Sequence, residues 1–242
     1  MSRKELARNA RPSADFPLPK PVAARGTSLG VALKNRATNR SISGKKLSSQ
    51  MISNLLWSAC GVNRRNGPFG IPGRTAASAS NAQEIDVYVA REEGVYRYEP
   101  VSHRLALVAA EDLRALAIGE GQGGAGANAP VRLIYVVEID RLREAPFQEP
   151  GLRDSATQQA YYYVDTGLIA ENVYLFAASQ GLAAWFHNCS RTRLSAKLGL
   201  GKGQRVLFGQ TIGYPDLTAG KPVERPARRA PRPSASRAAR LS

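Results

Sequence analysis

The chain has 242 residues and a mass of 26.1 kDa, which is enough for one large domain or two small ones. It is 43% hydrophobic and 22% charged and has no run of about 18 uncharged apolar residues, so a coiled coil, a wholly disordered chain and a membrane-spanning segment are excluded. Two cysteines, Cys60 and Cys189, cannot build a disulfide framework or a cysteine-rich metal site. The basic first residues are not followed by the apolar segment of a signal peptide, and the sequence therefore predicts a cytoplasmic protein.

The net charge of +15 is concentrated at the two ends of the sequence. Residues 1–40 carry nine basic and two acidic side chains, and residues 220–242 carry seven basic and one acidic. We interpret residues 1–27 as a basic arm rich in Pro, Ala and Arg, residues 28–218 as the folded domain, and residues 219–242 as an extended or disordered tail. Basic tails can hold acidic partners, but no nucleic-acid-binding motif accompanies this one, and a solvated extension is the favoured interpretation.

The first half of the predicted domain contains one clear helix and several strands. Apolar residues recur at helical spacing over 48–59, where Ser48 stands at the N-cap position. A loop rich in Gly and Pro follows, and further on Gly94 separates two of the strands. The other elements expected in this half are strands at 85–90, 95–98, 105–108 and 131–139 and a helix near 110–117.

The second half is dominated by one long helical pattern whose apolar residues are so numerous that most of its circumference should be covered, as in a central helix. Because the strands do not alternate with helices as in βαβ units, the sequence predicts an α+β fold with an antiparallel or mixed sheet. The order expected here is a helix at 155–180 ended by Gly181, a strand at 182–186, a helix at 190–198 between Ser190 and Gly199, and a strand at 206–212.

Three patterns that resemble known motifs lack the context that their chemistry needs. A G-x-G-x-x-G pattern begins at Gly119, but a dinucleotide-binding loop must follow a strand and begin a helix, whereas this one follows a predicted helix and leads into a strand. Asp165-Thr-Gly matches the aspartic-protease tripeptide but lies inside a helical pattern. His187 and Cys189 have strand spacing, yet no third residue orients them, so a structural role for the histidine is the favoured interpretation.

Three short segments, far apart in the sequence, carry candidate ligand-binding groups. Arg36, Thr38 and Arg40 alternate, so in an extended segment two guanidinium groups and a hydroxyl share one face, as binding of a phosphate requires. The loop 73–83 is polar and built of small residues, which lets its backbone approach a flat ligand. Residues 181–190 lead from a strand to a helix N-terminus, where unpaired N–H groups point outward.

Taken in order, these segments resemble the nitroreductase-like family of FMN-dependent oxidoreductases. Within that family the chain is most similar to the branch that includes the SagB-type azoline dehydrogenases of thiazole- and oxazole-modified peptide pathways. The resemblance extends from about residue 28 to residue 215, most of the predicted domain. The matching motifs, as they stand here, are R-A-T-N-R from Arg36, L-L-W-S-A-C-G-V-N-R from Leu55, G-R-T-A-A-S-A-S-N-A-Q from Gly73, V-D-T-G-L-I-A-E-N-V-Y-L from Val164 and G-Y-P from Gly213.

The resemblance implies an antiparallel sheet flanked by helices and a homodimer with two FMN molecules at the subunit interface. By position, Arg36 and Thr38 would hold the FMN phosphate or ribityl chain, and Arg40 would lie near the pyrimidine edge of the ring. The backbone of Asn188 and Cys189 would face N5 of the ring. Residues that would reach the FMN of the partner subunit are Ser78, Ala79 and Asn81, and Arg225 would be a C-terminal phosphate ligand.

The implied activity is ping-pong transfer of two electrons through FMN, from NADH or NADPH to a small nitro or quinone acceptor, with no catalytic side chain on the protein. The sequence departs from the family pattern at Ala77, where Pro is common, and at Asn188-Cys189, where Gly-Gly is common, and these side chains would narrow the choice of substrate or reduce activity. Two alternatives share the fold: an azoline-type dehydrogenase acting on a modified peptide, and a flavin-fold binding protein whose basic ends hold an acidic or nucleic-acid partner. In a third alternative, the protein is a generic α+β protein in which Arg36, Thr38 and Arg40 are ordinary surface residues.

Overall fold

The computed structural model describes residues 15–22, 26–119, 126 and 128–218. Arg225 and the rest of the predicted tail lie outside these residues, as does most of the predicted N-terminal arm. No helix among the described residues is long and apolar enough to cross a membrane.

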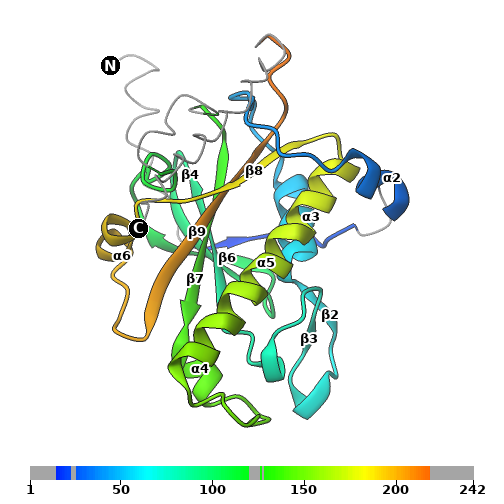
Figure 1. Ribbon diagram of the computed structural model, residues 1–242. Helices are drawn as coiled ribbons and strands as arrows, with labels where there is room; N and C mark the ends of the chain where they lie inside the picture. The colour runs from blue at the N-terminus through cyan, green and yellow to red at the C-terminus, as the bar shows by residue number, and fades with distance from the viewer. Residues whose placement is uncertain (1–14, 23–25, 120–125, 127, 219–242) are drawn as a thin grey trace, which may run out of the picture.

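The architecture is a seven-stranded sheet in which every neighbouring pair of strands is antiparallel, in the order β1-β6-β5-β4-β7-β9-β8 (Figure 1). The predicted α+β class and antiparallel sheet are therefore confirmed. A separate two-stranded hairpin, which the sequence analysis missed, is formed by β2 (Val62–Arg64) and β3 (Gly73–Arg74). The strands of the main sheet are β1 (Phe16–Pro17), β4 (Ile85–Arg91), β5 (Gly94–Glu99), β6 (Arg104–Ala109), β7 (Val131–Glu138), β8 (Ala183–His187) and β9 (Gln204–Gly213).

Helices cover both faces of this sheet, with α3 and α5 on one face and α6 on the other (Figure 1). The predicted helices at 48–59, 155–180 and 190–198 are confirmed, and α2 and α4 were not expected. The helices are α2 (Leu29–Asn35), α3 (Ser49–Cys60), α4 (Ile139–Arg143), α5 (Ser155–Ser179) and α6 (Arg191–Lys197), with 3₁₀ turns η1 (Pro68–Gly70) and η2 (Ala79–Asn81).

Local sequence explains where the long helices begin and end. Ser48 accepts a hydrogen bond from the backbone N–H of Met51 at 3.2 Å and so caps α3, as predicted. The N-cap of α5 is Asp154, whose carboxylate accepts from the N–H of Thr157 at 2.8 Å. After α5 the chain turns at Gly181 with φ of +66°, a left-handed conformation that costs glycine no steric strain.

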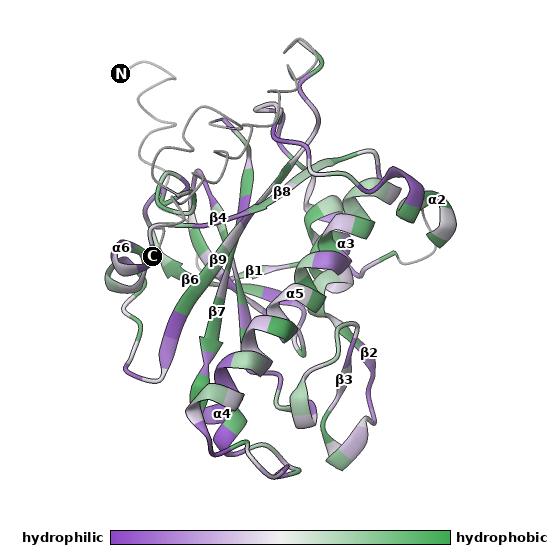
Figure 2. Ribbon diagram, viewed as in Figure 1, coloured by the Kyte–Doolittle hydropathy of each residue, from purple (hydrophilic) through white to green (hydrophobic). Residues whose placement is uncertain are grey.

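The core lies on both sides of the central strand β7. Leu133 and Tyr135 pack with α3 and α5, whereas Ile134 and Val136 pack with α6, because successive strand residues point to opposite faces. Residues 131–137 are consequently all buried. Figure 2 shows the matching hydrophobic colour along β7 and much of α5.

The helix predicted near 110–117 is wrong, because the backbone N–H of Arg114, which a helix would direct to the carbonyl of residue 110, donates to the Asp112 carboxylate at 3.0 Å. The segment forms a single turn closed by the N–H of Ala117 on the Leu113 carbonyl at 3.1 Å. The Arg114 carbonyl accepts from the N–H of Ala117 at 3.2 Å and also from the guanidinium of the buried Arg132 on β7. The Leu116 carbonyl accepts from the backbone N–H of Ser190 at 2.9 Å. Ser190 stands at the N-cap position of α6, but its side chain makes no capping hydrogen bond, contrary to prediction.

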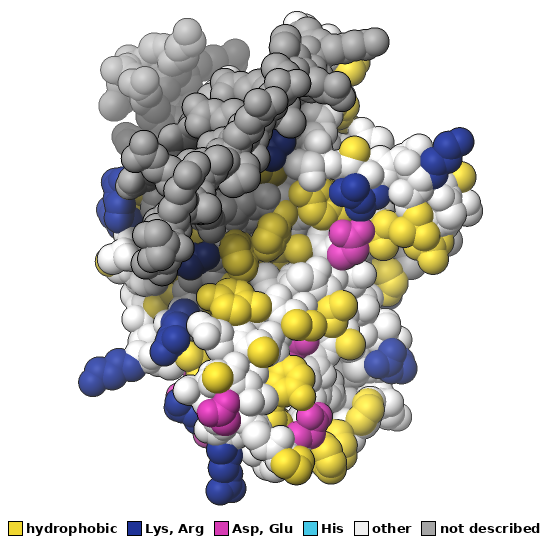
Figure 3. All heavy atoms as spheres, in the orientation of Figure 1, with side chains coloured by type: hydrophobic (Ala, Val, Ile, Leu, Met, Phe, Trp, Pro, Cys, Tyr) yellow, Lys and Arg dark blue, Asp and Glu magenta, His cyan; other side chains and the backbone are white. Residues whose placement is uncertain are grey.

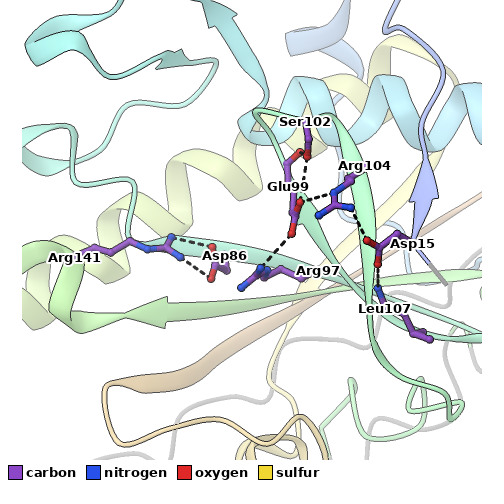
Figure 4. Close-up of polar contacts among 8 residues, drawn as sticks. All are labelled: Asp15, Asp86, Arg97, Glu99, Ser102, Arg104, Leu107 and Arg141. Carbon is purple, nitrogen blue, oxygen red and sulfur yellow. Dashed lines mark hydrogen bonds and ion pairs between the residues drawn. The ribbon is translucent and has the colours of Figure 1, made fainter.

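A polar network holds the edge strand β1 against β6 (Figure 4). Asp15 accepts from the guanidinium of Arg104 and, at 3.3 Å, from the backbone N–H of Leu107. Arg104 also donates to Glu99 on β5 at 2.6 Å. This network lies at the surface and contributes orientation more than stability.

Candidate functional site

The first candidate segment follows α2 and runs beside the edge strand β8. Arg36 is the C-cap of α2, so the extended chain begins only at this residue. The backbone N–H of Asn39 donates to the Ala184 carbonyl of β8 at 2.9 Å. Thr38 Oγ1 lies 3.2 Å from the hydroxyl of Tyr174 on α5. The segment is therefore fixed by β8 and by the C-terminal half of α5.

Both arginines of this segment are exposed and rest on aromatic rings. The guanidinium carbon of Arg36 lies 5.6 Å from the ring centre of Tyr174, and that of Arg40 lies 5.2 Å from the ring centre of Trp185. Among the described residues neither arginine forms an ion pair. Stacking thus orients two positive charges without neutralising them, which is what an anion-binding site requires.

The turn after β8 adds backbone donors to this region. The N–H groups of Asn188 and Cys189 make no hydrogen bond within the described part of the chain. His187 has a structural role, as favoured from the sequence: its Nε2 lies 2.8 Å from Thr211 Oγ1, and burial lowers its pKa to about 4, so it stays neutral. Burial raises the pKa of the Cys189 thiol to about 11, so this cysteine is protonated at neutral pH and is not a nucleophile.

The second candidate segment, the loop 73–83, lies against the middle of α5. Its backbone N–H at Ala79 donates to the Asp165 carboxylate at 2.8 Å. Ser78 Oγ accepts from the N–H of Gln83 at 3.0 Å. The Gln83 carbonyl in turn accepts from Arg141, which also forms a bidentate pair with Asp86 at the start of β4 (Figure 4). Hydrogen bonds at Ala79 and Gln83 therefore fix the second half of this loop.

Backbone strain is concentrated in this loop. Ser80, Asn81 and Gln83 have φ angles of 48°, 54° and 51°, in the left-handed region that side chains rarely adopt. Such residues cost about 1–3 kcal/mol each and persist only where surrounding contacts hold them, as at functional sites.

A buried carboxyl pair lies beneath the loop. Glu84 is fully buried, and neither of its carboxyl oxygens has a hydrogen-bond partner among the described residues. Burial, with a contribution from the neighbouring Asp165, raises the pKa of Glu84 to about 8, and burial raises the pKa of Asp165 as well. Glu84 is consequently protonated at neutral pH, because two adjacent buried carboxylates cannot both ionise cheaply.

The structure brings the predicted site residues together in two groups rather than one. Arg36, Thr38, Arg40, Asn188 and Cys189 surround β8, whereas Ser78, Ala79 and Asn81 lie at the level of Asp165. Tyr174 and Asp165 are nine residues apart on α5, which corresponds to roughly 13 Å along the helix axis at 1.5 Å per residue. One chain therefore carries two separate groups of candidate residues, which we call the two half-sites of the predicted site.

The aromatic supports of the arginines and the carboxyl pair were missed from the sequence. Tyr174 and Trp185 look like ordinary core residues, and only the fold places them under Arg36 and Arg40. Glu84 had a detectable signal, since it is a charged residue between a loop and a buried strand. Arg225 and most of the Gly119–Pro130 loop lie outside the described residues.

The structure is that of an α+β protein with two polar groups of candidate residues: two arginines without an ion-pair partner among the described residues, and a strained loop of small residues. The model of the family described as "Nitroreductase family" matches residues 33–214. The chain therefore belongs to the nitroreductase family, which confirms the resemblance and makes it an oxidoreductase enzyme.

Two relatives are named as putative nitroreductases. MJ1384 of Methanocaldococcus jannaschii is 29% identical over 159 residues, which is 63% of this chain and 73% of that protein. The crystal structure of reut_a1228 from Ralstonia eutropha JMP134 has 34% identity and a TM-score of 0.74, and it covers 84% of this chain and 90% of its own. The nitroreductase-like fold is therefore established.

Two more distant structures share the fold alone. A chain of the Escherichia coli microcin synthetase McbBCD complex with bound truncated pro-MccB17 has 17% identity and a TM-score of 0.61, over 89% of this chain and 83% of its own. The NADPH:FMN oxidoreductase of Vibrio harveyi, complexed with NAD+, has 18% identity and a TM-score of 0.53, over 78% of this chain and 69% of its own.

Proposed function

We propose that this protein is an FMN-dependent oxidoreductase that passes two electrons from a nicotinamide nucleotide to a small organic acceptor such as a nitro or quinone compound. The observation that carries the proposal is the pair of unneutralised arginines on Tyr174 and Trp185, beside free backbone donors of the next turn. The name of the Vibrio harveyi neighbour, an NADPH:FMN oxidoreductase, supports the choice of cofactor and donor.

The residues present fit FMN by their donor chemistry. FMN carries a phosphate dianion and a flat ring that becomes negatively charged on reduction. Arg36 and Thr38 would hold the phosphate or the ribityl chain, since guanidinium and hydroxyl groups both donate to phosphate oxygen. Arg40 would stabilise the negative charge of the reduced ring, and the backbone of Asn188 and Cys189 would donate to its N5 side.

When bound, FMN supplies the two-electron chemistry, and the protein supplies binding, orientation and charge. No side chain of the site is suited to nucleophilic attack, because the Cys189 thiol is protonated and His187 is neutral and hydrogen-bonded to Thr211. The guanidinium groups of Arg36 and Arg40 are cations without an ion-pair partner among the described residues and so attract an anionic cofactor.

We propose further that the active form is a homodimer in which Ser78, Ala79 and Asn81 of one subunit complete the site of the other. On one chain the loop lies roughly 13 Å along the axis of α5 from the arginines. An apolar stripe on α5 is exposed, with Tyr163 at 37% and Val164 at 58%. Hydrophobic side chains also gather over the α5 region in the space-filling view (Figure 3). A second copy would bury such a stripe.

The visible spectrum of the purified protein tests the proposal. We expect flavin absorbance that bleaches on addition of NADPH or NADH. Arg36→Ala should reduce FMN retention more than Arg40→Ala, whereas Arg40→Ala should lower the reduction potential of the bound flavin. Arg193→Ala, at an exposed position on α6, serves as the control. Colourless protein that does not take up FMN would refute the proposal, and normal occupancy and potential in both site variants would refute the assignment of the segment.

A dehydrogenase acting on a modified peptide is the second candidate, favoured by the fold shared with a chain of the microcin synthetase McbBCD complex, which has truncated pro-MccB17 bound. Reduction of the flavin by an azoline-containing peptide, without nicotinamide nucleotide, would support it. A binding protein whose basic ends hold an acidic partner is separated by deleting residues 219–242. We expect FMN content to stay nearly unchanged, whereas loss of a salt-sensitive nucleic-acid complex would favour the binding protein.

A further inference from the structure

A second binding surface lies beside the strained loop and takes no part in the FMN site proposed for this chain's own arginines. It is a cavity of about 480 Å³ between the β2–β3 hairpin, the loop 73–83 and the segment that precedes α5. In Figure 1 the hairpin and the segment between α4 and α5 lie near the same end of α5. The residues of its wall that matter here are Arg64, Phe69, Arg74, Ser78, Asn81 and Phe147.

Two phenylalanines at the mouth of this cavity are exposed instead of buried. Phe69 is 59% and Phe147 is 52% exposed, although both are among the most hydrophobic residues. Their rings are nearly parallel, with an interplanar angle of 10° and a centroid separation of 6.2 Å. Flat aromatic surface left open to solvent in this way is suited to stacking with a planar ligand.

The backbone at one of these rings, Phe69, is strained. Phe69 has φ of 60°, and for a bulky side chain this left-handed conformation is a genuine outlier. Five described non-glycine residues have positive φ, and three of them, Phe69, Ser80 and Asn81, line this cavity. Backbone strain of this kind is common where a ligand is bound.

The wall of the cavity is positively charged. Arg64 and Arg74 line it, and no acidic residue does. Neither arginine forms an ion pair within the described ranges of the chain. Arg74 is held in place by Gln83, to which its Nε donates at 2.6 Å. Arg64 lies over Gly73 so closely that a Cβ on that glycine would come within 2.6 Å of its guanidinium.

From these features we infer that this cavity binds a planar aromatic anion, with the ring on Phe69 and Phe147 and the negative group on Arg64. The inference rests on the proposed oxidoreductase function in one respect: the ligand is the electron acceptor of the flavin that the Ser78–Asn81 loop reaches in the other subunit. A quinone or nitroaromatic that also carries a carboxylate or sulfonate satisfies this chemistry. Its quinone or nitro group takes up the two electrons, with protons from the reduced flavin and from water, while its acid group meets Arg64. A neutral aromatic of the same shape lacks the charge that the arginines complement.

Calorimetric titration of the full-length protein with 2-naphthoate and 2-naphthamide tests the inference, because the two probes share a ring and differ in charge. We expect naphthoate to bind at least tenfold more tightly. Arg64→Gln should bring the two affinities within about threefold, while Arg65→Gln, an exposed neighbour outside the cavity, should change neither. Gly73→Ala should act like Arg64→Gln, since the added methyl displaces the guanidinium without removing it.

The aromatic contribution is tested with Phe69→Gly and Phe147→Ala. Both should weaken naphthoate and naphthamide alike, and Val101→Ala, at a 71% exposed valine elsewhere, should not. Phe69→Gly should not lower the melting temperature, because relief of the left-handed backbone offsets the loss of a half-exposed ring. A fall in melting temperature with unchanged naphthoate binding would mean that the ring is structural and would overturn its assignment.

Flavin content measured on the same samples separates this inference from the proposed function. Protein that retains FMN but binds both probes equally, or neither, overturns the inference alone. Protein that binds naphthoate but no FMN overturns the proposed function and the acceptor role, and leaves the anion site. With flavin bound, naphthoate should raise the KM for 1,4-naphthoquinone without changing kcat, and the absence of competition would refute the acceptor role.

Discussion

Replacing Glu84 with glutamine perturbs the carboxyl pair beneath the strained loop without changing its shape. The pKa of Glu84 is raised from an ordinary 4.5 to about 8, first by burial and then by Asp165. A carboxyl group whose pKa is raised in the folded state stabilises the fold fully below its unfolded pKa, and this contribution is lost as the pH rises toward the folded pKa. The wild-type protein should therefore lose stability between about pH 4.5 and pH 8.

The size of the effect follows from the width of this window. Each pKa unit corresponds to about 1.4 kcal/mol, so the loss relative to acid is about 3 kcal/mol at pH 7 and about 5 kcal/mol above pH 8. Glu84→Gln has no proton to lose, and its amide N–H can donate to the Asp165 carboxylate. We therefore expect the free energy of unfolding of this variant to vary much less with pH, and to exceed that of the wild type above pH 8.

Urea denaturation at pH 5, 6, 7, 8 and 9 measures the effect directly. Glu99→Gln is the matched control, because a hydrogen bond from Arg104 lowers the pKa of Glu99 and the sign of its contribution is opposite. That variant should keep the descending limb of the wild type. Parallel stability curves for the wild type and Glu84→Gln, or a wild-type curve that stays flat from pH 5 to pH 8, would refute the raised pKa of Glu84.

Three further predictions concern the interface, the core and the cysteines. Val164→Glu, on the exposed face of α5, should give a monomer by sedimentation analysis that no longer retains FMN, and a dimer with normal flavin would contradict the interface. Leu55→Ala, at a fully buried position on α3, should lower the free energy of unfolding by about 2–5 kcal/mol in urea, and a loss under 1 kcal/mol would contradict the packing described. Burial raises the pKa of Cys60 to about 12 and of Cys189 to about 11, so a thiol reagent at pH 8 should label neither in the native protein and both in urea.

The elements predicted correctly are those whose signal is local. The helices 48–59 and 155–180 have a capping residue or a glycine stop and a long apolar period, and the strands from Ile85 to Val137 are rich in β-branched and aromatic residues. The helix near 110–117 was predicted wrongly because the Asp112 carboxylate accepts the backbone N–H of Arg114 that a helix would direct to residue 110. The spacing of apolar residues contains no information about such a bond from backbone to side chain.

Part of the candidate site could be predicted from local sequence, and the rest depends on the fold. The arginines near residue 36 could be selected because charge and alternation are visible in the sequence. Their exposure on Tyr174 and Trp185, and the separation of the two half-sites, depend on how β8 and α5 meet. The cavity lined by Phe69 and Phe147 was not predicted, since these residues are far apart in sequence and lie in irregular segments. Only the fold makes them neighbours.

Asp165 lies in the helix that the sequence predicts and also contacts the candidate loop 73–83. Its helical context excluded the protease motif, and the structure places it in α5 as that argument requires. The same periodicity also puts it on the buried face with Tyr162, Ile169 and Val173. A carboxylate there costs free energy unless it is hydrogen-bonded. The Asp165 carboxylate accepts the backbone N–H of Ala79 at 2.8 Å and so holds the strained loop 73–83 in place. A charged residue on the apolar face of a helix is therefore a candidate for a functional role, whatever tripeptide motif contains it.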